Sequence, residues 1–458
     1  MVTTSRRTFL ALSAMATASS FLPAPVFNKD FISDDWPDHG RGREQTRFNP
    51  QETIIGPKNV SHLRLRWEFE AGSGITGTPA VVGERVIFGS WDGCVYALNR
   101  LSGKLIWKFD AGVRSYPPDR QLGIFASPAV AGRAVYVAGD RLIKLDFENG
   151  KKIWERTVGN PGKTFEYFWA PPLVYAERVY AGVSDGSEKT TRGRFVCLDA
   201  VTGMPRWTFF TVAADVAGGA VFAALSLDPQ TETLYGVTGS PFHIGPGPLR
   251  HSCSLIALNA LTGALRWADQ VHPHDEQNLD LNCPPMLISA AHAGTRRQLI
   301  VVGGKDGIRA WDRITKKRLW RSQLTPSIPP DGKESLPTTG PETGPTAAAY
   351  GLVFFASNNH GDKSCLIAGL EATTGELRWL HSLPAFEFGP ISVANGVVYL
   401  GLVDGKLRAW HAQRGDLLWE SAAGQPIAAG AAIAHGMVFV GTGAGAFLPG
   451  NKLMAFAL

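Results

Sequence analysis

The chain has 458 residues, enough for two or three ordinary domains, and a formal net charge of +5 with its basic residues scattered along the sequence. This balance lacks the basic face that is typical of nucleic-acid-binding proteins, so we predict no nucleic-acid partner. Outside the N-terminus, no stretch reaches the about 18 apolar residues that a membrane-spanning helix needs, so we predict no membrane span in the mature chain. The 51 Gly and 13 Trp residues favour a turn-rich β protein.

Residues 1–26 have the pattern of an export signal. Arg6 and Arg7 are followed by Thr8-Phe9-Leu10 and then by an Ala-rich apolar stretch that ends near Val26. A charged start, an apolar centre and a small-residue exit are typical of signal peptides. The paired arginines before Phe-Leu indicate the twin-arginine type, which exports folded proteins in bacteria; an ordinary secretory signal with two arginines is the alternative. We expect a mature chain that begins near residue 27 and is periplasmic or extracellular.

Residues 27–62 form an N-terminal segment, and a repeated β pattern follows over residues 63–458. The first full unit contains four short runs of β-branched and aromatic residues, at 78–82, 85–89, 94–99 and 104–109, separated by Gly-rich turns. Such runs predict a four-stranded sheet. A single sheet of this size cannot bury both of its faces, so neighbouring units are expected to stack face to face.

Tryptophan marks these units at intervals of 40 to 60 residues. Repeats of about this length in an all-β pattern are typical of propeller blades. We interpret each Trp as a wedge between two blades, with an indole N–H that needs a partner across the blade boundary. At Trp320 the turn glycine is replaced by Lys316, and Trp67 precedes the first full unit. The other six follow a Gly-x-x-x-Trp phrase: Gly103–Trp107, Gly150–Trp154, Gly203–Trp207, Gly263–Trp267, Gly375–Trp379 and Gly415–Trp419.

The two ends of the repeat region are incomplete in complementary ways. Residues 427–458 supply strands but no closing Gly-x-x-x-Trp strand, whereas residues 63–70 form an isolated strand of that closing type. Pairing the two gives a composite last blade and removes an open sheet edge. The sequence therefore predicts an all-β, eight-bladed propeller in one closed ring. The odd number of widely spaced cysteines, five, gives no disulfide framework, and we expect several of them, at strand positions, to be buried apolar fillers.

The most specific motifs lie in residues 35–60. Asp35-Trp36-Pro37-Asp38-His39-Gly40, Thr46-Arg47-Phe48-Asn49-Pro50 and Ile55-Gly56-Pro57-Lys58-Asn59-Val60 closely resemble the N-terminal motif of quinoprotein alcohol dehydrogenases, the polyvinyl-alcohol dehydrogenase branch being the nearest match. The resemblance covers residues 35–458. It implies an eight-bladed propeller that holds pyrroloquinoline quinone (PQQ) and Ca²⁺ on the ring axis. The Cys-x-x-Cys-His haem motif is missing, so the fused cytochrome domain of some members is not expected.

The resemblance implies a set of cofactor and metal contacts. Glu188, followed by Arg192-Gly193, matches the family's Glu-x-x-x-Arg-Gly phrase and is the implied Ca²⁺ ligand; a solvated loop carboxylate is the alternative. Ser240 stands where the family's Thr-Gly-Asn-Pro phrase has its Asn ligand, and is a weaker oxygen donor. Phe222 stands where the family places a Trp against the quinone, and Phe can still stack with less area.

The implied catalytic positions also depart from the family pattern. His272 to Asp280 resembles the phrase that carries the proton-abstracting Asp, but the best-aligned position is Asn278, whose amide is no base near neutral pH. Asp280, two residues on and on the same side of a strand, is the nearby substitute. Lys305, in Gly304-Lys305-Asp306-Gly307, matches the family's Lys-x-Gly phrase and would contact the quinone oxygens. The resemblance thus implies that these residues converge at the axial mouth.

Two function classes follow from these observations. The first is an exported PQQ-dependent dehydrogenase that oxidises a small alcohol or polyol and passes the electrons to an external acceptor. The second is a non-catalytic propeller that binds protein in the cell envelope, like assembly scaffolds that share the repeat. The retained His-Pro-His-Asp-Glu stretch and the Glu188 and Lys305 positions favour the enzyme, whereas Ser240, Phe222 and Asn278 leave its present activity open.

Overall fold

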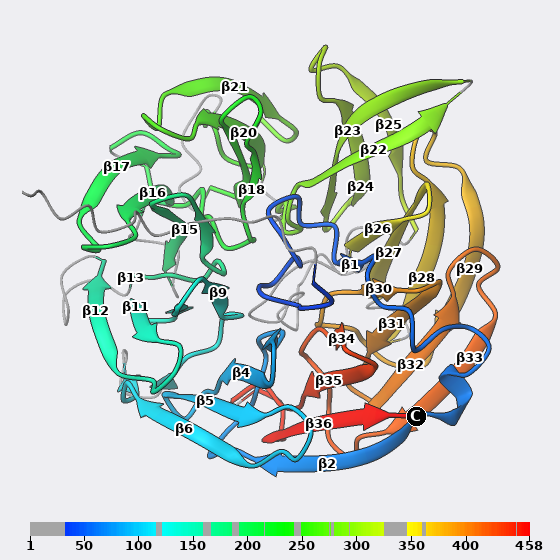
Figure 1. The fold of residues 1–458 in the computed structure, drawn as a ribbon. Coiled ribbons are helices and arrows are strands. Elements are labelled where there is room, and N and C mark those ends of the chain that lie inside the picture. The colour runs from blue at the N-terminus through cyan, green and yellow to red at the C-terminus, as the bar shows by residue number, and fades with distance from the viewer. Residues whose placement is uncertain are drawn as a thin grey trace, which may run out of the picture.

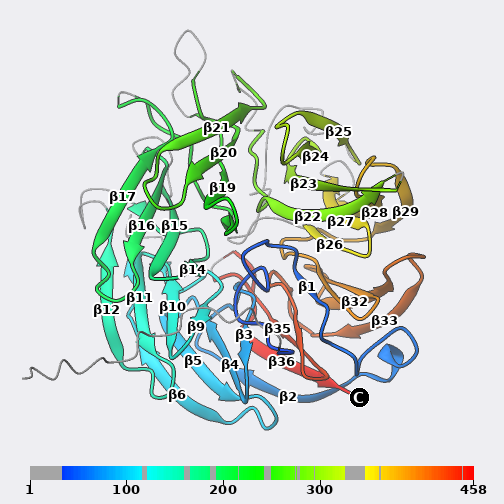
Figure 2. The same ribbon diagram turned by 45° about the horizontal axis from the view of Figure 1, so that its top comes forward.

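The computed structural model describes residues 33–458, apart from 116–120, 159–165, 186–191, 215, 242–248, 274, 276–278, 293, 325–345, 360–362 and 446. Eight antiparallel sheets stand as blades around a central axis (Figure 1), each running from an inner strand near the axis to an outer strand at the rim (Figure 2). In the described residues the only helix is the short 3-10 helix η1 (Val60–His62). The predicted all-β, eight-bladed propeller is confirmed. No described helix has the length and apolar character to cross a membrane.

Blades 1 to 4 each use four consecutive strands, ordered from the axis outward. A short pair, β7 (Arg114–Ser115) and β8 (Gln121–Leu122), lies between blades 1 and 2, and β13 (Glu166–Tyr167) adds to blade 3. The blade strands are β3 (Ala80–Val82), β4 (Arg85–Gly89), β5 (Cys94–Asn99) and β6 (Leu105–Asp110); β9 (Ala129–Ala131), β10 (Ala134–Ala138), β11 (Arg141–Asp146) and β12 (Lys152–Thr157); β14 (Leu173–Tyr175), β15 (Arg178–Asp185), β16 (Arg194–Asp199) and β17 (Pro205–Phe210); β18 (Ser226–Asp228), β19 (Thr233–Val237), β20 (Ser254–Asn259) and β21 (Leu265–Gln270).

Blades 5 to 7 repeat this order, and blade 8 combines both ends of the chain. Strand β1 (Phe48–Asn49) adds to the inner edge of blade 7. The blade strands are β22 (Met286–His292), β23 (Thr295–Gly304), β24 (Gly307–Asp312) and β25 (Arg318–Ser322); β26 (Thr346–Ala349), β27 (Leu352–Asn359), β28 (Ser364–Glu371) and β29 (Leu377–Leu383); β30 (Ser392–Ala394), β31 (Val397–Gly401), β32 (Lys406–His411) and β33 (Leu417–Ala422); β34 (Ala432–Ala434), β35 (Met437–Gly441), β36 (Lys452–Ala457) and β2 (Arg64–Glu70).

The ring closes in blade 8 as the sequence predicts. Strand β2 pairs antiparallel with β36, from Arg64 opposite Ala457 to Glu70 opposite Lys452. Figure 1 shows the blue β2 running along the outer edge of the red β36. Because β2 covers the edge of the C-terminal strand, the ring has no open edge at the point where the two ends meet.

The repeated Gly-x-x-x-Trp phrase forms the seam between blades. At Gly375, φ is +75°, and an added Cβ would lie 2.6 Å from the Trp320 ring of the preceding blade. The Trp320 indole N–H in turn donates to the carbonyl oxygen of Ala372, at 3.1 Å, across the boundary. The phrase therefore needs glycine for two reasons, a left-handed backbone and a close aromatic face. The same bond across the boundary is made by Trp67, Trp107, Trp154, Trp207 and Trp379, which confirms the wedge interpretation for these six.

An N-terminal hoop, residues 36–49, covers the axial opening on one face and appears as the dark blue trace at the centre of Figure 1. Its Arg47 side chain is 1% exposed. The Arg47 guanidinium donates to the carbonyl oxygens of Ile391 and His39 and to the hydroxyl groups of Thr78 and Ser392. Inner-strand N–H groups of six blades donate to hoop carbonyl oxygens at 2.7–2.9 Å: Val81 to Trp36, Val130 to Pro37, Leu227 to Arg43, Leu287 to Glu44, Ala348 to Thr46 and Val393 to Arg47. The family-specific motif is thus the part of the chain that ties the inner strands together.

All five cysteines are buried and free, and burial was predicted for several of them. Burial raises the pKa of the Cys197 thiol to about 12, so this thiol is neutral at physiological pH. Cys197 and Cys365 lie in blade cores among aliphatic and aromatic side chains. Their role in the described fold is packing.

Candidate functional site

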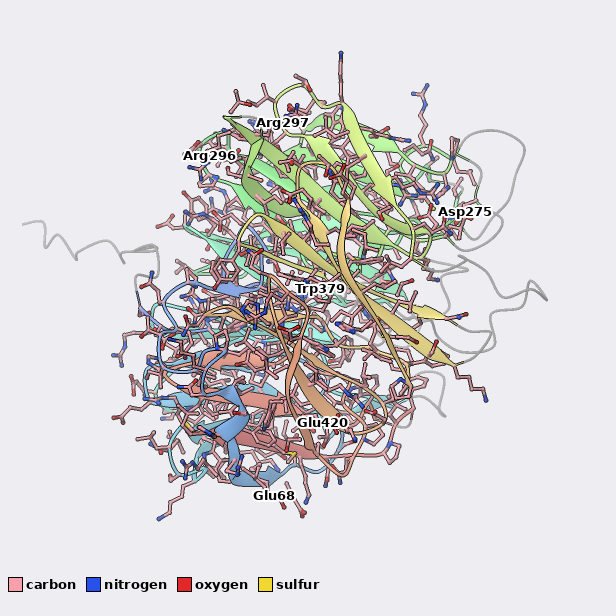
Figure 3. All side chains as sticks on the ribbon, turned by 90° about the vertical axis from the view of Figure 1, so that its right-hand side faces the viewer. Glu68, Asp275, Arg296, Arg297, Trp379 and Glu420 are labelled. Atoms are coloured by element: carbon pink, nitrogen blue, oxygen red, sulfur yellow. The ribbon has the colours of Figure 1, made fainter. Side chains whose placement is uncertain are left out.

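Blade topology gathers the predicted site residues on one face of the ring. In an antiparallel blade, the turn between the second and third strands lies at the same end as the connection to the next blade. Ser240 and Lys305 follow the second strands of blades 4 and 5, whereas Phe222 and Asp280 lie on the connections that lead into these blades. Figure 3 shows the ring edge-on, with Asp275 at this face and the blue N-terminal segment at the opposite face.

Asp280 is the centre of the described cluster. Its Oδ2 lies 2.8 Å from Lys305 Nζ, and its Oδ1 accepts the backbone N–H of Ser240 at 2.6 Å. The Asp280 carbonyl oxygen also accepts the Lys305 N–H, at 3.1 Å. Asp280 is 6% exposed and the Lys305 side chain 10%. A nearly buried carboxylate is therefore matched by a cation and by a backbone donor.

Ser240 joins Asp280 to a second buried carboxylate. The Ser240 hydroxyl donates to Asp275 Oδ2 at 2.5 Å, and the same oxygen accepts the N–H of Leu279 at 2.7 Å. Cys253 Sγ lies 3.3 Å from that oxygen. Burial, with the charges of Asp280 and Asp275, raises the pKa of the Cys253 thiol far above its usual range. Cys253 is therefore a neutral donor to the cluster and no nucleophile.

Phe222 lies against the backbone beside Ser240. A Cβ added to Gly239 would be 2.8 Å from Phe222 Cε1 and 2.8 Å from Asp280 Oδ1. Gly239 is thus required by the close approach of an aromatic ring on one side and a carboxylate on the other. Phe222 is 9% exposed, so little of its ring is accessible to a ligand in this structure.

Two of the predicted residues, Glu188 and Asn278, lie outside the described residues. The structure describes residues that follow each of them. Arg192, four residues after Glu188, forms a bridge with Gly218, and Gly218 forms another with Pro241 next to Ser240. Arg192 is therefore two bridges away from Pro241. The backbone N–H of Leu279, which follows Asn278, donates to Asp275 Oδ2.

Sequence reasoning did not single out Asp275 or Glu387. Asp275 belongs to the His-Pro-His-Asp-Glu stretch, and the signal that could have identified it was its place beside the phrase that carries Asp280. Glu387 lies on the connection from β29 to β30, in the apolar run Ala385-Phe386-Glu387-Phe388. It is 5% exposed, and burial raises the pKa of its carboxyl to about 8. The sequence feature that could have identified Glu387 is a single Glu in an apolar run at a blade connection.

The donor set fits a hard cation only in part. Within the described residues, no group of three or more His, Cys, Asp and Glu side chains is arranged to hold a metal ion. Asp275, Asp280 and Ser240 offer the carboxylate and hydroxyl oxygens that Ca²⁺ prefers, but the Ser240 hydroxyl is already bonded to Asp275. A complete site needs a further donor, and Glu188 is the predicted one.

Comparison with known families agrees with this fold and these motifs. The model of the glucose/ethanol/alcohol dehydrogenase β-propeller domain matches residues 36–320, which is more than half of the chain. This protein therefore belongs to that family, a class of PQQ-dependent dehydrogenase propellers. The model of the outer membrane protein assembly factor BamB matches residues 304–457.

Individual relatives are similar over most of the chain. A polyvinylalcohol dehydrogenase of Pseudomonas sp is 26% identical over 90% of this chain and 73% of its own, and one of Sphingopyxis sp. strain 113P3 is 25% identical over 93% and 75%. The quinohemoprotein alcohol dehydrogenase ADH IIB of Pseudomonas putida is 28% identical over 66% of this chain and 49% of its own.

Solved structures support the fold. A europium-containing methanol dehydrogenase superposes with a TM-score of 0.80 at 21% identity, covering 93% of this chain and 98% of the other. BamB from Moraxella catarrhalis gives a TM-score of 0.57 at 14% identity, covering 86% and 98%. At these identities the likeness concerns the fold alone.

Proposed function

We propose that this protein is an exported, PQQ-dependent dehydrogenase that oxidises an alcohol or polyol with the help of a divalent cation such as Ca²⁺. The observation that carries the proposal is the Asp280–Lys305 pair, 2.8 Å apart and nearly buried on the connection face of a ring of this family. A carboxylate that can take a hydroxyl proton, beside a cation that can face a reduced oxygen, is the pairing that alcohol oxidation needs.

In this proposal Asp280 accepts the substrate hydroxyl proton. Its oxygens already accept from Ser240 and Lys305, but a carboxylate has about four lone-pair positions, so it can still receive a substrate hydroxyl. Lys305 offsets the charge of Asp280 before the reaction. PQQ, when bound, would accept two electrons from the alcohol carbon. Phe222 would support the ring system, and Glu188 with Ser240 would hold the cation.

The export of the protein rests on its first 26 residues and on the family. Arg6 and Arg7 precede the apolar stretch that we interpret as a twin-arginine signal. Such a signal exports folded proteins in bacteria. Fusing residues 1–32 to a reporter that is active only after export tests this part, with Arg6→Lys and Arg7→Lys together as the control.

The decisive experiment is a titration of the purified protein with PQQ, with and without Ca²⁺, followed by absorbance and Trp fluorescence. We expect a one-to-one complex that requires the cation, and dye-linked oxidation of an alcohol by that complex. Lys305→Ala should weaken both binding and turnover, whereas Glu376→Gln, an exposed turn residue, should change neither.

The second candidate function is a non-catalytic scaffold that binds protein in the cell envelope. The observation that favours it is the match of the BamB model to residues 304–457. The same titration separates the two, because a scaffold neither binds PQQ stoichiometrically nor oxidises any alcohol.

A further inference from the structure

The eight blades do not all form hydrogen bonds with the hoop. Six inner strands donate an N–H to a hoop carbonyl oxygen, as described above. Blade 8 is tied through a side chain, because Asn49 Nδ2 donates to the carbonyl oxygen of Ile433 at 2.8 Å. Blade 3 is the exception: within the described chain, which includes the whole hoop and all of β14, no hydrogen bond joins the two.

Blade 3 forms no such hydrogen bond because of the local structure of the hoop. Between Pro37, which serves blade 2, and Arg43, which serves blade 4, the chain makes a tight turn. Asp38 Oδ1 accepts the N–H groups of Gly40 and Gly42 at 3.1 and 2.8 Å. The carbonyl oxygen of Gly40 accepts the N–H of Arg47 at 2.9 Å. The turn is therefore bonded within the hoop and not to blade 3.

The register of the β14–β15 hairpin identifies the backbone N–H of β14 that the hoop leaves without a hydrogen bond. In blade 1, β3 and β4 pair through Val82 opposite Arg85, with Val81 opposite Val86, and Val81 bonds to the hoop. In blade 3, Tyr175 opposes Arg178 across an equally short turn, and Val174 opposes Val179. Because hydrogen-bonded and non-bonded pairs alternate in an antiparallel ladder, the Val174 N–H points away from β15, as the Val81 N–H points away from β4.

A cavity of about 350 Å³ occupies this position. It is lined by Asp38, Arg41, Gly42, Arg43 and Glu44 of the hoop, by Ala129, Val130 and Ala131 of β9, and by Leu173 and Val174 of β14. Its volume lies at the lower end of the about 300–1,000 Å³ of ligand pockets. Blades 2 and 3 give it aliphatic walls, and the hoop gives it a polar side.

Two donors are open in this cavity, whose lining also includes the carboxylates of Asp38 and Glu44. Val174 offers its N–H, and Arg41 Nε is buried with no acceptor within the described residues. Asp38 Oδ1 is occupied by its own turn. The charge of Arg41 is offset by Asp34, Asp35 and Asp38 nearby. The site therefore calls for a hydrogen-bond acceptor that does not itself carry much negative charge.

We propose that this gap is a binding site for a short extended segment of a partner polypeptide, which adds to the edge of β14. In six other blades an inner-strand N–H already donates to a backbone carbonyl oxygen of the hoop. A peptide carbonyl is a neutral acceptor of this kind, and strand addition is a recurrent mode of peptide recognition. A small aliphatic side chain on the segment would lie against Leu173 and Val130. The proposal does not depend on the dehydrogenase activity.

Two matched proline variants test the premise. Val174→Pro removes an N–H that makes no bond, whereas Val130→Pro removes one that is bonded to Pro37. Pro is tolerated on edge strands where the N–H is unused. We expect Val174→Pro to unfold within a few degrees of the unmodified protein and Val130→Pro to unfold at a clearly lower temperature. In hydrogen exchange, the Val174 amide should exchange at least tenfold faster than those of Val81 and Val130. Equal protection would overturn the register argument.

Binding is tested with the capped peptide acetyl-Val-Ala-Val-amide and protein labelled with ¹⁵N-valine. The Val174 amide signal, identified from its loss in Val174→Pro, should shift with millimolar peptide, whereas the Val81 and Val393 signals should not. Ala131→Phe, which fills the cavity and keeps the Val174 N–H, should raise the dissociation constant at least tenfold. If acetate shifts the same signal and the peptide does not, the site takes a small carboxylate and the peptide proposal is wrong. No shift with either probe also refutes it.

Discussion

Glu387 offers a direct test of how burial controls a charge on the connection face. Its carboxyl has a pKa of about 8 in the folded chain, against 4.5 for an ordinary Glu, and the sole cause is burial. The folded protein therefore keeps a proton that the unfolded chain releases, and between pH 4.5 and about 8 its stability falls as pH rises. One pKa unit corresponds to about 1.36 kcal/mol, so at pH 7 the penalty is about 3 kcal/mol. Glu387→Gln, which has no proton to lose, should remove it.

The assay is urea unfolding of the variant and the unmodified protein between pH 5 and pH 9. The difference in unfolding free energy should be small near pH 5, grow by about 1.4 kcal/mol per pH unit, and level off above pH 8. Glu376→Gln at an exposed turn is the control and should show no such trend. A difference that stays flat with pH, or a variant that is less stable at every pH, would refute the reasoning that Glu387 is held neutral by burial.

Three further changes test the site and the ring. Asp280→Asn should lower alcohol turnover by about 10²–10⁴-fold, the usual loss of a general base, and leave PQQ affinity nearly unchanged; full activity in steady-state assays would contradict the base assignment. Gly375→Ala should cost about 2–4 kcal/mol in urea unfolding, because its Cβ meets the Trp320 ring at φ +75°, and an unchanged midpoint would count against the seam argument. Deleting residues 63–70 should expose the edge of β36, lower the unfolding temperature sharply and promote association seen by light scattering, an outcome that a monomeric, equally stable variant would exclude.

Much of the ring could be predicted because each blade repeats its own local rules. Gly103 and Trp107 recur at fixed spacing, and their structural reasons, a positive φ and an indole bond across the seam, are local to one blade boundary. The one turn that has Lys316 in place of glycine supports this local explanation. Lys316 keeps φ at +63° without being glycine, so the backbone conformation survives there although the residue does not favour it. The composite closure followed from the missing closing strand at the C-terminal end and the isolated strand at residues 63–70.

The candidate site was predictable only where a motif names its residue. Lys305 and Asp280 could be placed on one face because each belongs to a recognisable phrase. In the structure Lys305 Nζ lies 2.8 Å from Asp280 Oδ2. The bond from Ser240 to Asp275 joins residues 35 positions apart, and no periodicity in the sequence encodes such a pair. Glu387 is harder still, because its property is an effect of burial, which depends on the surrounding blades and not on its neighbours in sequence.

The two faces of the ring explain why the fold could be predicted from the sequence more fully than the site. On one face the hoop bonds to seven of the eight blades, through Arg47, Asn49 and its backbone carbonyl oxygens, so its motif is constrained by seven blades at once. On the other face, single side chains on separate connections meet, and each can change without loosening the ring. Replacement of a family Asn by Ser240 alters one donor and leaves the seams intact. A chain of this kind can therefore keep the full architecture of a dehydrogenase while its chemistry depends on whether Asp280 and Lys305 still serve it.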